Sequence, residues 1–185
     1  MFGFFRRKKK KEEPHYDPTN LRITDLRKGW FVDYDFQTWE AIEEYEYDWG
    51  NQDFSYEFLL DNGSGQQLFL SIEEDDGLNC VIFEKMRFST LPQADEIEAA
   101  VKSNGKPPRQ LQLNGIRYYF DGEYPGFWRN IKDSKSQEFM LWDYWDDSDE
   151  KCLNIEQWDD NTFEAALGTW KPEHAFSNLT PREQA

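Results

Sequence analysis

Two glutamates occupy equivalent places in a short motif that occurs twice in the sequence. The pattern Leu-x-Ile-Glu spans residues 70–73 and 153–156, so it ends on Glu73 and then on Glu156. If the two carboxyls met across a pseudo-twofold axis, one could act as general acid and the other as general base, as in glycoside hydrolysis. The nearby indoles that could stack on a sugar ring are Trp142, Trp145 and Trp158. The simpler interpretation is that both glutamates are solvated on the polar side of a strand.

Acidic and aromatic residues also alternate in one stretch of the second half of the sequence. Carboxylates supply charge pairing and indole faces supply cation–π contact, and together they suit a multiply charged cation. The stretch therefore predicts a site for a polyamine or for a basic segment of a partner protein. Its candidate binding residues are Asp143, Trp145, Asp146, Asp147, Trp158 and Asp159. The alternative is that the aromatic side chains fill a β core while the acids face water.

Other common chemistries lack their residue patterns. The oxygen-rich run at residues 143–150 does not have the spacing of an EF-hand, because Lys151 stands where that loop needs glycine. The two histidines, His15 and His174, are far apart in the chain, and neither a glycine-rich phosphate loop nor a nucleophile elbow occurs. The sequence therefore predicts no metal, no cofactor and no catalytic residue, and it favours a protein that is not an enzyme.

Charge and aromatic content define the broad class of the chain. Its 185 residues include 37 Asp and Glu against 21 Lys and Arg, for a net charge of −16, and they include 15 Phe, 9 Tyr and 8 Trp. This aromatic content indicates a folded core, because disordered chains combine high charge with few aromatic residues. An acidic surface repels phosphate, which excludes a free nucleic-acid-binding protein.

A basic arm precedes the acidic body of the chain. Residues 1–13 contain six cations and two anions. Near an anionic membrane surface each cation contributes about 1 kcal/mol, and phenylalanines insert among the headgroups. The expected membrane-contact residues are Phe2, Phe4, Phe5, Arg6, Arg7, Lys8, Lys9, Lys10 and Lys11. The alternative is a solubilising tail that folds back on the acidic body.

The two cysteines indicate a reducing compartment. Cys80 and Cys152 lie in apolar, strand-like stretches and lack the CxxC spacing of a metal or redox site. We expect both to be buried as free thiols. This predicts a cytoplasmic protein, which the basic arm would bring to the inner face of the membrane.

Runs of aromatic and β-branched residues, separated by turn signals, predict a mainly β fold. The clearest hairpin signal is at residues 61–65, and one helix is expected to begin near Pro92 and to end before Gly105. We expect a flexible arm at 1–20, a first β half at 21–88, a linking helix and loop at 89–108, and a second β half at 109–182.

The second half repeats the order of the first. The matching segments are 29–35 and 115–121, 57–60 and 138–141, and 70–73 and 153–156. They predict an internal duplication, in which two similar antiparallel β-meanders form one sandwich or barrel-like domain. Strand alternation should bury the Leu and Ile of each Leu-x-Ile-Glu motif and point Glu73 and Glu156 to the opposite face.

Several short motifs carry a family resemblance. The second half holds Leu153-x-Ile155-Glu156-x-Trp158, Phe163-Glu164-Ala165-Ala166-x-Gly168 and Phe176-Ser177-Asn178-Leu179-Thr180-Pro181. With Gly29-x-x-Val32-x-Tyr34 and Trp39, they resemble the bacterial family called domain of unknown function 4178 over about residues 22–182. The resemblance implies a cytoplasmic, β-rich protein with no catalytic residues to transfer. It also implies a link to membrane stress, because members tend to be encoded beside membrane-stress components and a spermidine-synthase-like enzyme.

Three functions follow from these patterns. The first is a non-enzymatic, cytoplasmic binding or adaptor domain, whose acidic body holds a basic partner and whose arm touches the inner membrane. The second is a polyamine-binding accessory protein that uses the acidic aromatic residues. The third is a carboxylate-pair, glycosidase-like enzyme that uses Glu73 and Glu156.

Overall fold

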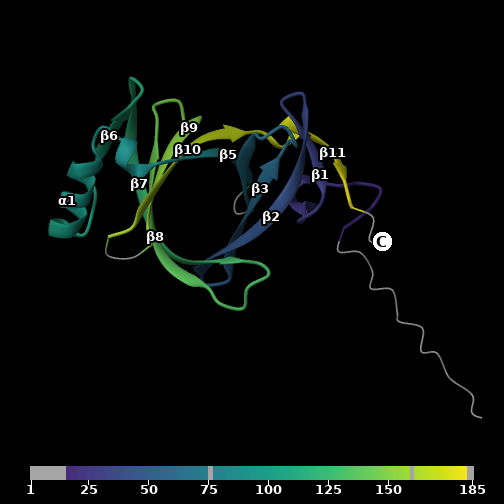
Figure 1. Cartoon of the computed structure of the whole chain (residues 1–185), viewed down its shortest axis with the longest axis horizontal. Coiled ribbons are helices and arrows are strands. Elements are labelled where there is room, and N and C mark those ends of the chain that lie inside the picture. The colour runs from purple at the N-terminus through teal and green to yellow at the C-terminus, as the bar shows by residue number, and fades with distance from the viewer. Residues whose placement is uncertain (1–15, 75–76, 159–160, 183–185) are drawn as a thin grey trace, which may run out of the picture.

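The strands of the protein join into one antiparallel sheet. The computed structural model describes residues 16–74, 77–158 and 161–182. The strands of the first half are β1 (Phe31–Tyr34), β2 (Gln37–Gly50), β3 (Asp53–Asp61), β4 (Gln67–Glu74) and β5 (Leu78–Met86). Those of the second half are β6 (Gln110–Leu113), β7 (Ile116–Asn130), β8 (Gln137–Trp145), β9 (Lys151–Gln157), β10 (Phe163–Lys171) and β11 (Phe176–Thr180). Their order in the sheet is β11-β1-β2-β3-β4-β5-β10-β9-β8-β7-β6 (Figure 1).

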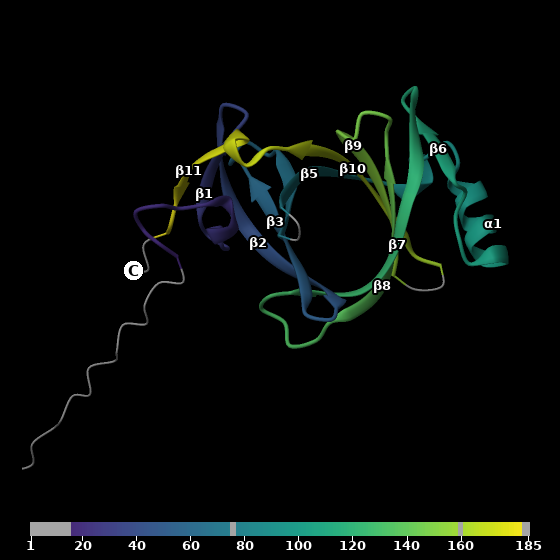
Figure 2. The same ribbon diagram turned by 180° about the vertical axis from the view of Figure 1, so that it is seen from behind.

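The sheet closes into a ring because β2 and β7 pair with each other. These two strands, 14 and 15 residues long, extend beyond β1 and β6, the short strands that precede them in their hairpins. Tyr45 therefore lies opposite Asn130, and Asp48 lies opposite Phe127. The pairing joins eight strands, β2-β3-β4-β5-β10-β9-β8-β7, into the ring seen in Figure 2. Strands β1, β11 and β6 extend the sheet beyond the ring, which is therefore not a regular barrel. The predicted mainly β fold of antiparallel meanders is confirmed.

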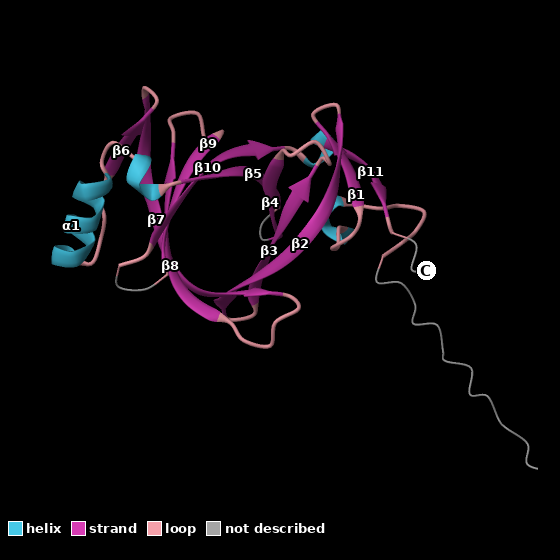
Figure 3. Ribbon diagram, in the orientation of Figure 1, coloured by secondary structure: helices cyan, strands magenta, loops and turns pink. Residues whose placement is uncertain are grey.

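One helix and one pair of strands cover the outside of the ring. Helix α1 (Ala94–Asn104) lies against the second half, and β1 and β11 lie against the first half, together with the short helix η1 (Ile23–Asp25) (Figure 3). Two further 3₁₀ turns, η2 (Phe88–Thr90) and η3 (Glu173–Ala175), connect strands. The covers leave the inside of the ring to the side chains of its own strands.

Two separate apolar cores result from this arrangement. The first packs Val32 of β1 and Phe176 of β11 onto the outward side chains of β2 to β5, including Phe58 and Leu70. The second packs α1 onto the outward side chains of β7 to β10. Its buried members include Ala94, Ile97, Val101, Trp142, Tyr144, Leu153 and Ile155. The ring is therefore held by apolar contacts on its outer faces, one per half.

The sequence of α1 explains its limits. Asp95 and Glu96 lie in the first turn, where the positive end of the helix dipole favours acids. Gly105 ends the helix in the left-handed conformation, at φ 72°, and its N–H donates to the carbonyl of Val101. The predicted helix is confirmed, and it lies within the predicted linking segment 89–108.

The Leu-x-Ile-Glu motifs lie in corresponding strands, β4 and β9. Leu70, Ile72, Leu153 and Ile155 are all buried in the outer cores, as the alternation predicts. The matching segments 57–60 and 138–141 also fall in corresponding strands, β3 and β8, whereas 29–35 spans β1 and 115–121 opens β7. Two of the three sequence matches therefore coincide with the topology, and the duplication itself stays a prediction.

The two cysteines are buried free thiols, as predicted. Cys80 packs in the first outer core, and burial raises its pKa to about 12. Burial also raises the pKa of Cys152, which lies on the inner side of β9 opposite Gly168. Neither thiol is poised to ionise at neutral pH.

A substitution at Gly168 of β10 tests how tightly the inner side of the ring is packed beside Cys152. A Cβ at this position would overlap the sulfur of Cys152 and contact Phe83 at 2.5 Å. We expect Gly168→Ala to lower the free energy of unfolding by about 2–3 kcal/mol, measured by urea denaturation, because the overpacked strands must separate. Gly77→Ala is the control, since no atom lies within 4 Å of a Cβ there. Equal stability of both variants would contradict the packing described.

Candidate functional site

The second side of each ring strand faces into the ring and carries charged residues. Because Leu153 and Ile155 of β9 belong to the outer core, the alternate residues Asn154 and Glu156 point inward. Glu57 in β3 points inward for the same reason. The polar side of these alternating strands therefore lies on the inner face of the ring.

One group of inward side chains, the Lys85 cluster, combines an excess of acids with a single lysine. Its members come from five strands and are Tyr47, Glu57, Lys85, Glu156 and Glu164. The Tyr47 hydroxyl donates to Glu57 Oε1 at 3.2 Å, and Lys85 Nζ donates to Glu164 Oε2 at 3.4 Å. Strands β3 and β9 are not neighbours in the sheet, so Glu57 and Glu156 act on each other across the ring. Lys85 thus donates a hydrogen bond to Glu164 and interacts electrostatically with Glu57 and Glu156.

Burial and mutual repulsion shift the protonation of these acids. Desolvation raises the pKa of Glu156 to about 7, and the charges of Glu57 and Glu164 add to the rise, while Lys85 opposes it. Desolvation also raises the pKa of Glu57, against the opposing effects of Lys85 and the Tyr47 hydroxyl. The cluster therefore holds more negative charge above neutral pH than its one lysine balances.

Solvent reaches part of this inner face. Lys85 and Glu164 keep 36% and 45% of their side chains exposed, although both project from the inner side of the ring. Glu57, by contrast, is only 7% exposed. The cluster therefore has a solvent-exposed side at Lys85 and a buried side at Glu57.

Aromatic side chains form the inner face where β2 meets β7, and we call them the aromatic wall. Its members are Tyr45, Tyr47, Trp49, Tyr124, Trp128, Phe139 and Trp158, which form seven ring–ring contacts with centroid separations of 5.0–6.3 Å. Gly126 makes room for them, because a Cβ there would lie 3.0 Å from Phe139 and Trp49. Tyr47 belongs to both the wall and the Lys85 cluster, so the aromatic faces adjoin the acids.

Ion pairs beside the aromatic wall reinforce the closure of the ring. Arg129 of β7 pairs with Glu46 of β2 at 2.7 Å. Glu43 accepts hydrogen bonds from Lys28, Asn130 and Lys132, which lower its pKa to about 2. The contacts of Arg129, Asn130 and Lys132 bridge segments more than 80 residues apart in the sequence, whereas Lys28 lies 15 residues from Glu43.

A second acidic group lies on the inner side of β8. Asp143 Oδ2 accepts a hydrogen bond from the Trp145 indole at 2.8 Å. Desolvation raises the pKa of Asp143 to about 7, and the charges of Asp121 and Glu73 add to the rise. Glu73 acts on Asp143 through its charge, from β4 across the ring. Acidic side chains therefore face one another at a second place on the inner face.

The six predicted binding residues do not form one cluster. Asp143 and Trp145 lie together, but Trp158 stands at the far end of β9, about 20 Å from the turn at residues 146–150. Asp146 holds that turn together, because its Oδ1 accepts the backbone N–H groups of Ser148, Glu150 and Lys151. Asp147 is exposed in the same turn, and Asp159 lies outside the described residues.

The two motif glutamates have different acidic neighbours. Glu57 and Glu164 raise the pKa of Glu156, whereas Glu73 raises that of Asp143. Both motif glutamates do occupy the inner face, as strand alternation predicts. The carboxylate-pair hypothesis stays a prediction.

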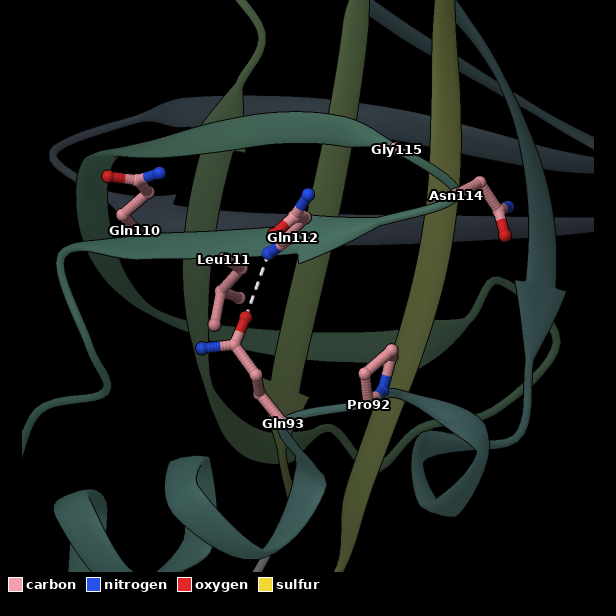
Figure 4. Close-up of a pocket in the computed structure, with 7 residues that line it drawn as sticks. All are labelled: Pro92, Gln93, Gln110, Leu111, Gln112, Asn114 and Gly115. Atoms are coloured by element: carbon pink, nitrogen blue, oxygen red, sulfur yellow. Dashed lines mark hydrogen bonds between the residues drawn. The ribbon is translucent and has the colours of Figure 1, made fainter.

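Two surface hollows lie away from the charged inner face. A groove of about 810 Å³ crosses the outer side between the two cores, with Trp39 and Ile82 on one side and Tyr118 and Leu167 on the other. A hollow of about 540 Å³ lies between edge strand β6 and the start of α1 (Figure 4). There Gln93 Oε1 accepts the backbone N–H of Gln112 at 2.8 Å, which occupies a donor of the sheet edge.

The described residues include neither a candidate metal site nor a candidate membrane-spanning helix. Among the described residues, no group of three or more His, Cys, Asp or Glu side chains could hold a metal ion. No helix in the described ranges is long and apolar enough to cross a membrane. The predicted membrane-contact residues, Phe2 to Lys11, lie outside these ranges.

Comparison with known proteins identifies the family. A model described as "Domain of unknown function (DUF4178)" matches residues 27–173. The chain belongs to this family. An uncharacterised protein of Aquifex aeolicus (strain VF5) is 28% identical over 190 residues, which cover 97% of this chain and 99% of that protein. No solved structure matches the chain.

Four members of the Lys85 cluster in this DUF4178 protein were not predicted from the sequence: Tyr47, Glu57, Lys85 and Glu164. Glu57, Lys85 and Glu164 lie in strands whose alternate residues are apolar, such as Phe58 and Leu60 beside Glu57. That alternation was a usable signal for an inward or outward polar face. Alternation within a strand does not predict that the polar sides of β3, β5, β9 and β10 face one another inside the ring.

Glu156 should make stability depend on pH. Its pKa is about 4.5 in the unfolded chain and about 7 in the folded protein. The free energy of unfolding therefore falls as the pH rises from 4.5 to 7. We expect Glu156→Gln, which cannot ionise, to be more stable than the wild type by about 3 kcal/mol at pH 8 and equal to it at pH 4. Denaturation curves at both pH values measure this. Glu138→Gln, at an exposed position of β8, is the control; the same gain at Glu138 would sink the assignment.

Proposed function

We propose that the protein is a non-enzymatic binding domain whose inner face holds a multiply charged organic cation of the polyamine class. The observation that carries this proposal is the Lys85 cluster, in which three carboxyls face one lysine. An added ammonium group would balance the charge that the fold leaves uncompensated. Part of the cluster is open to solvent, so that such a ligand has access.

The aromatic wall supports a cation of organic rather than inorganic type. Tyrosine and tryptophan faces attract ammonium groups and pack against methylene chains. The wall adjoins the carboxyls through Tyr47, so one ligand can contact both surfaces. A hydrated metal ion would use the carboxyls alone, and the described residues provide no metal-binding group of three.

Thermal denaturation with spermidine tests the cation site. At pH 8 and at one hundred times its Kd, a bound ligand stabilises the fold by about 2.7 kcal/mol, which should raise the Tm by about 5–10 °C. Sodium chloride at matched ionic strength should not reproduce the shift. The double substitution Glu57→Gln and Glu156→Gln should remove it, while Glu138→Gln should keep it. An equal effect of salt would reduce the proposal to charge screening.

A second candidate function is the adaptor predicted from the sequence, with a basic protein segment as partner and a role in membrane stress. The exposed Phe36 favours a protein contact, because it stands fully exposed at the turn between β1 and β2 with φ 60°. The acidic body supplies the charge for a basic partner. In this role, the basic arm would hold the domain at the inner face of the membrane.

Liposome flotation tests the membrane part of the adaptor function. With vesicles containing anionic lipid, the full chain should float and a chain lacking residues 1–13 should stay at the bottom, because the arm carries six cations. Raising the salt concentration should weaken flotation of the full chain. Equal flotation of both proteins would exclude the arm as the membrane contact.

A further inference from the structure

Two buried oxygens on the inner face lack hydrogen-bond donors. Asp143 of β8 and Asn154 of β9 lie directly opposite each other in the antiparallel register. Asp143 Oδ1 and Asn154 Oδ1 are both buried, and neither accepts a hydrogen bond from the described chain. Opposed residues of this kind have Cβ atoms about 5 Å apart, so one small donor group between them could reach both oxygens. Buried acceptors normally have partners, and an unpaired couple of them therefore indicates an absent donor.

The surroundings of Asp143 supply no positive charge. Its other oxygen already accepts the Trp145 indole N–H, which fixes the orientation of the carboxyl. The charged groups that act on it, Asp121 and Glu73, are both acids. A ligand group that pairs with Asp143 Oδ1 must therefore donate hydrogen bonds and is favoured if it carries positive charge.

The strand on the other side of Asp143 brings an aromatic side chain beside it. Gly122 of β7 lies opposite Asp143. The Tyr124 ring folds over Gly122, in the space that a larger side chain would fill. The subsite is thus bounded by Asn154 on one strand and by an aromatic ring on the other.

We propose that Asp143 and Asn154 form a subsite for a primary ammonium group, with Tyr124 beside it. This inference rests on the proposed function, because it names the end of the organic cation that the inner face binds. A primary ammonium has three N–H donors, enough for both Oδ1 atoms. A quaternary ammonium has none and would leave both oxygens unpaired.

The subsite and the Lys85 cluster lie within reach of one ligand. Asn154 and Glu156 are two residues apart on the same side of β9, which separates them by about 7 Å. A short aliphatic diamine can span that separation. One ammonium group would bind at Asp143 and Asn154, and the other would bind at Glu156.

The test compares 1,4-diaminobutane with its analogue carrying two trimethylammonium groups, by calorimetry on the full chain at pH 8 and constant ionic strength. We expect the diamine to bind the wild type at least tenfold more tightly than the analogue. Asp143→Asn should lower the affinity for the diamine at least tenfold. Asp147→Asn, which removes the same charge from an exposed turn, should leave it unchanged.

A second variant separates binding from folding. Asn154→Ala removes the opposing oxygen without a change of charge, and it should also weaken diamine binding while the analogue binds as before. If the diamine binds the wild type and both variants equally, the oxygen pair holds water only, and the subsite is wrong although the proposed function stands. Binding of the analogue as tightly as the diamine would also overturn the subsite. If neither compound binds, the proposed function fails with it.

Discussion

The pairing of β2 with β7 is the constraint on which the rest of the structure depends. An open eleven-strand sheet would offer two faces, and either could be covered or solvated. Closing eight strands into a ring gives every strand one side that faces outward and one that faces the opposite strands. Since α1, β1 and β11 cover parts of the outside, the residues of the two apolar cores lie there, and Glu57, Lys85, Glu156 and Glu164 lie within. The charged inner face is thus a consequence of where the covers are.

This arrangement reverses the usual distribution of a small ring of strands, whose interior is filled by apolar side chains. Here the interior contains aromatic rings at the β2–β7 closure, small and apolar side chains such as Cys152 and Phe83 around Gly168, and acids around Lys85. The cost appears in the pKa values of Glu156 and Asp143, both raised to about 7 by desolvation. A fold selected for stability alone would not place ionisable groups there, which is why the inner face, rather than the outer groove or the hollow beside β6, is the functional surface that we favour.

The ring also explains why local motifs were an incomplete guide to the site. The acidic stretch around residue 146 is the most conspicuous feature of the sequence, yet Asp146 serves mainly to hold a hairpin turn through backbone hydrogen bonds. Glu57 and Lys85 stand in ordinary strands, without any distinctive motif. They become a site because strands that are remote in sequence face one another across the ring.

The sequence by itself determined the strands, the single helix, the buried Leu and Ile of the repeated motif, the buried thiols and the family. Each depends on alternation, turn residues or local composition, which act within a few residues of chain. Only the tertiary structure decided that Glu57, Glu156 and Glu164 all act on Lys85, and that Glu73 acts on Asp143 across the ring. These relations depend on ring closure and on the stagger between strands. Both arise from packing between segments more than 80 residues apart, for which a single sequence contains no local signal.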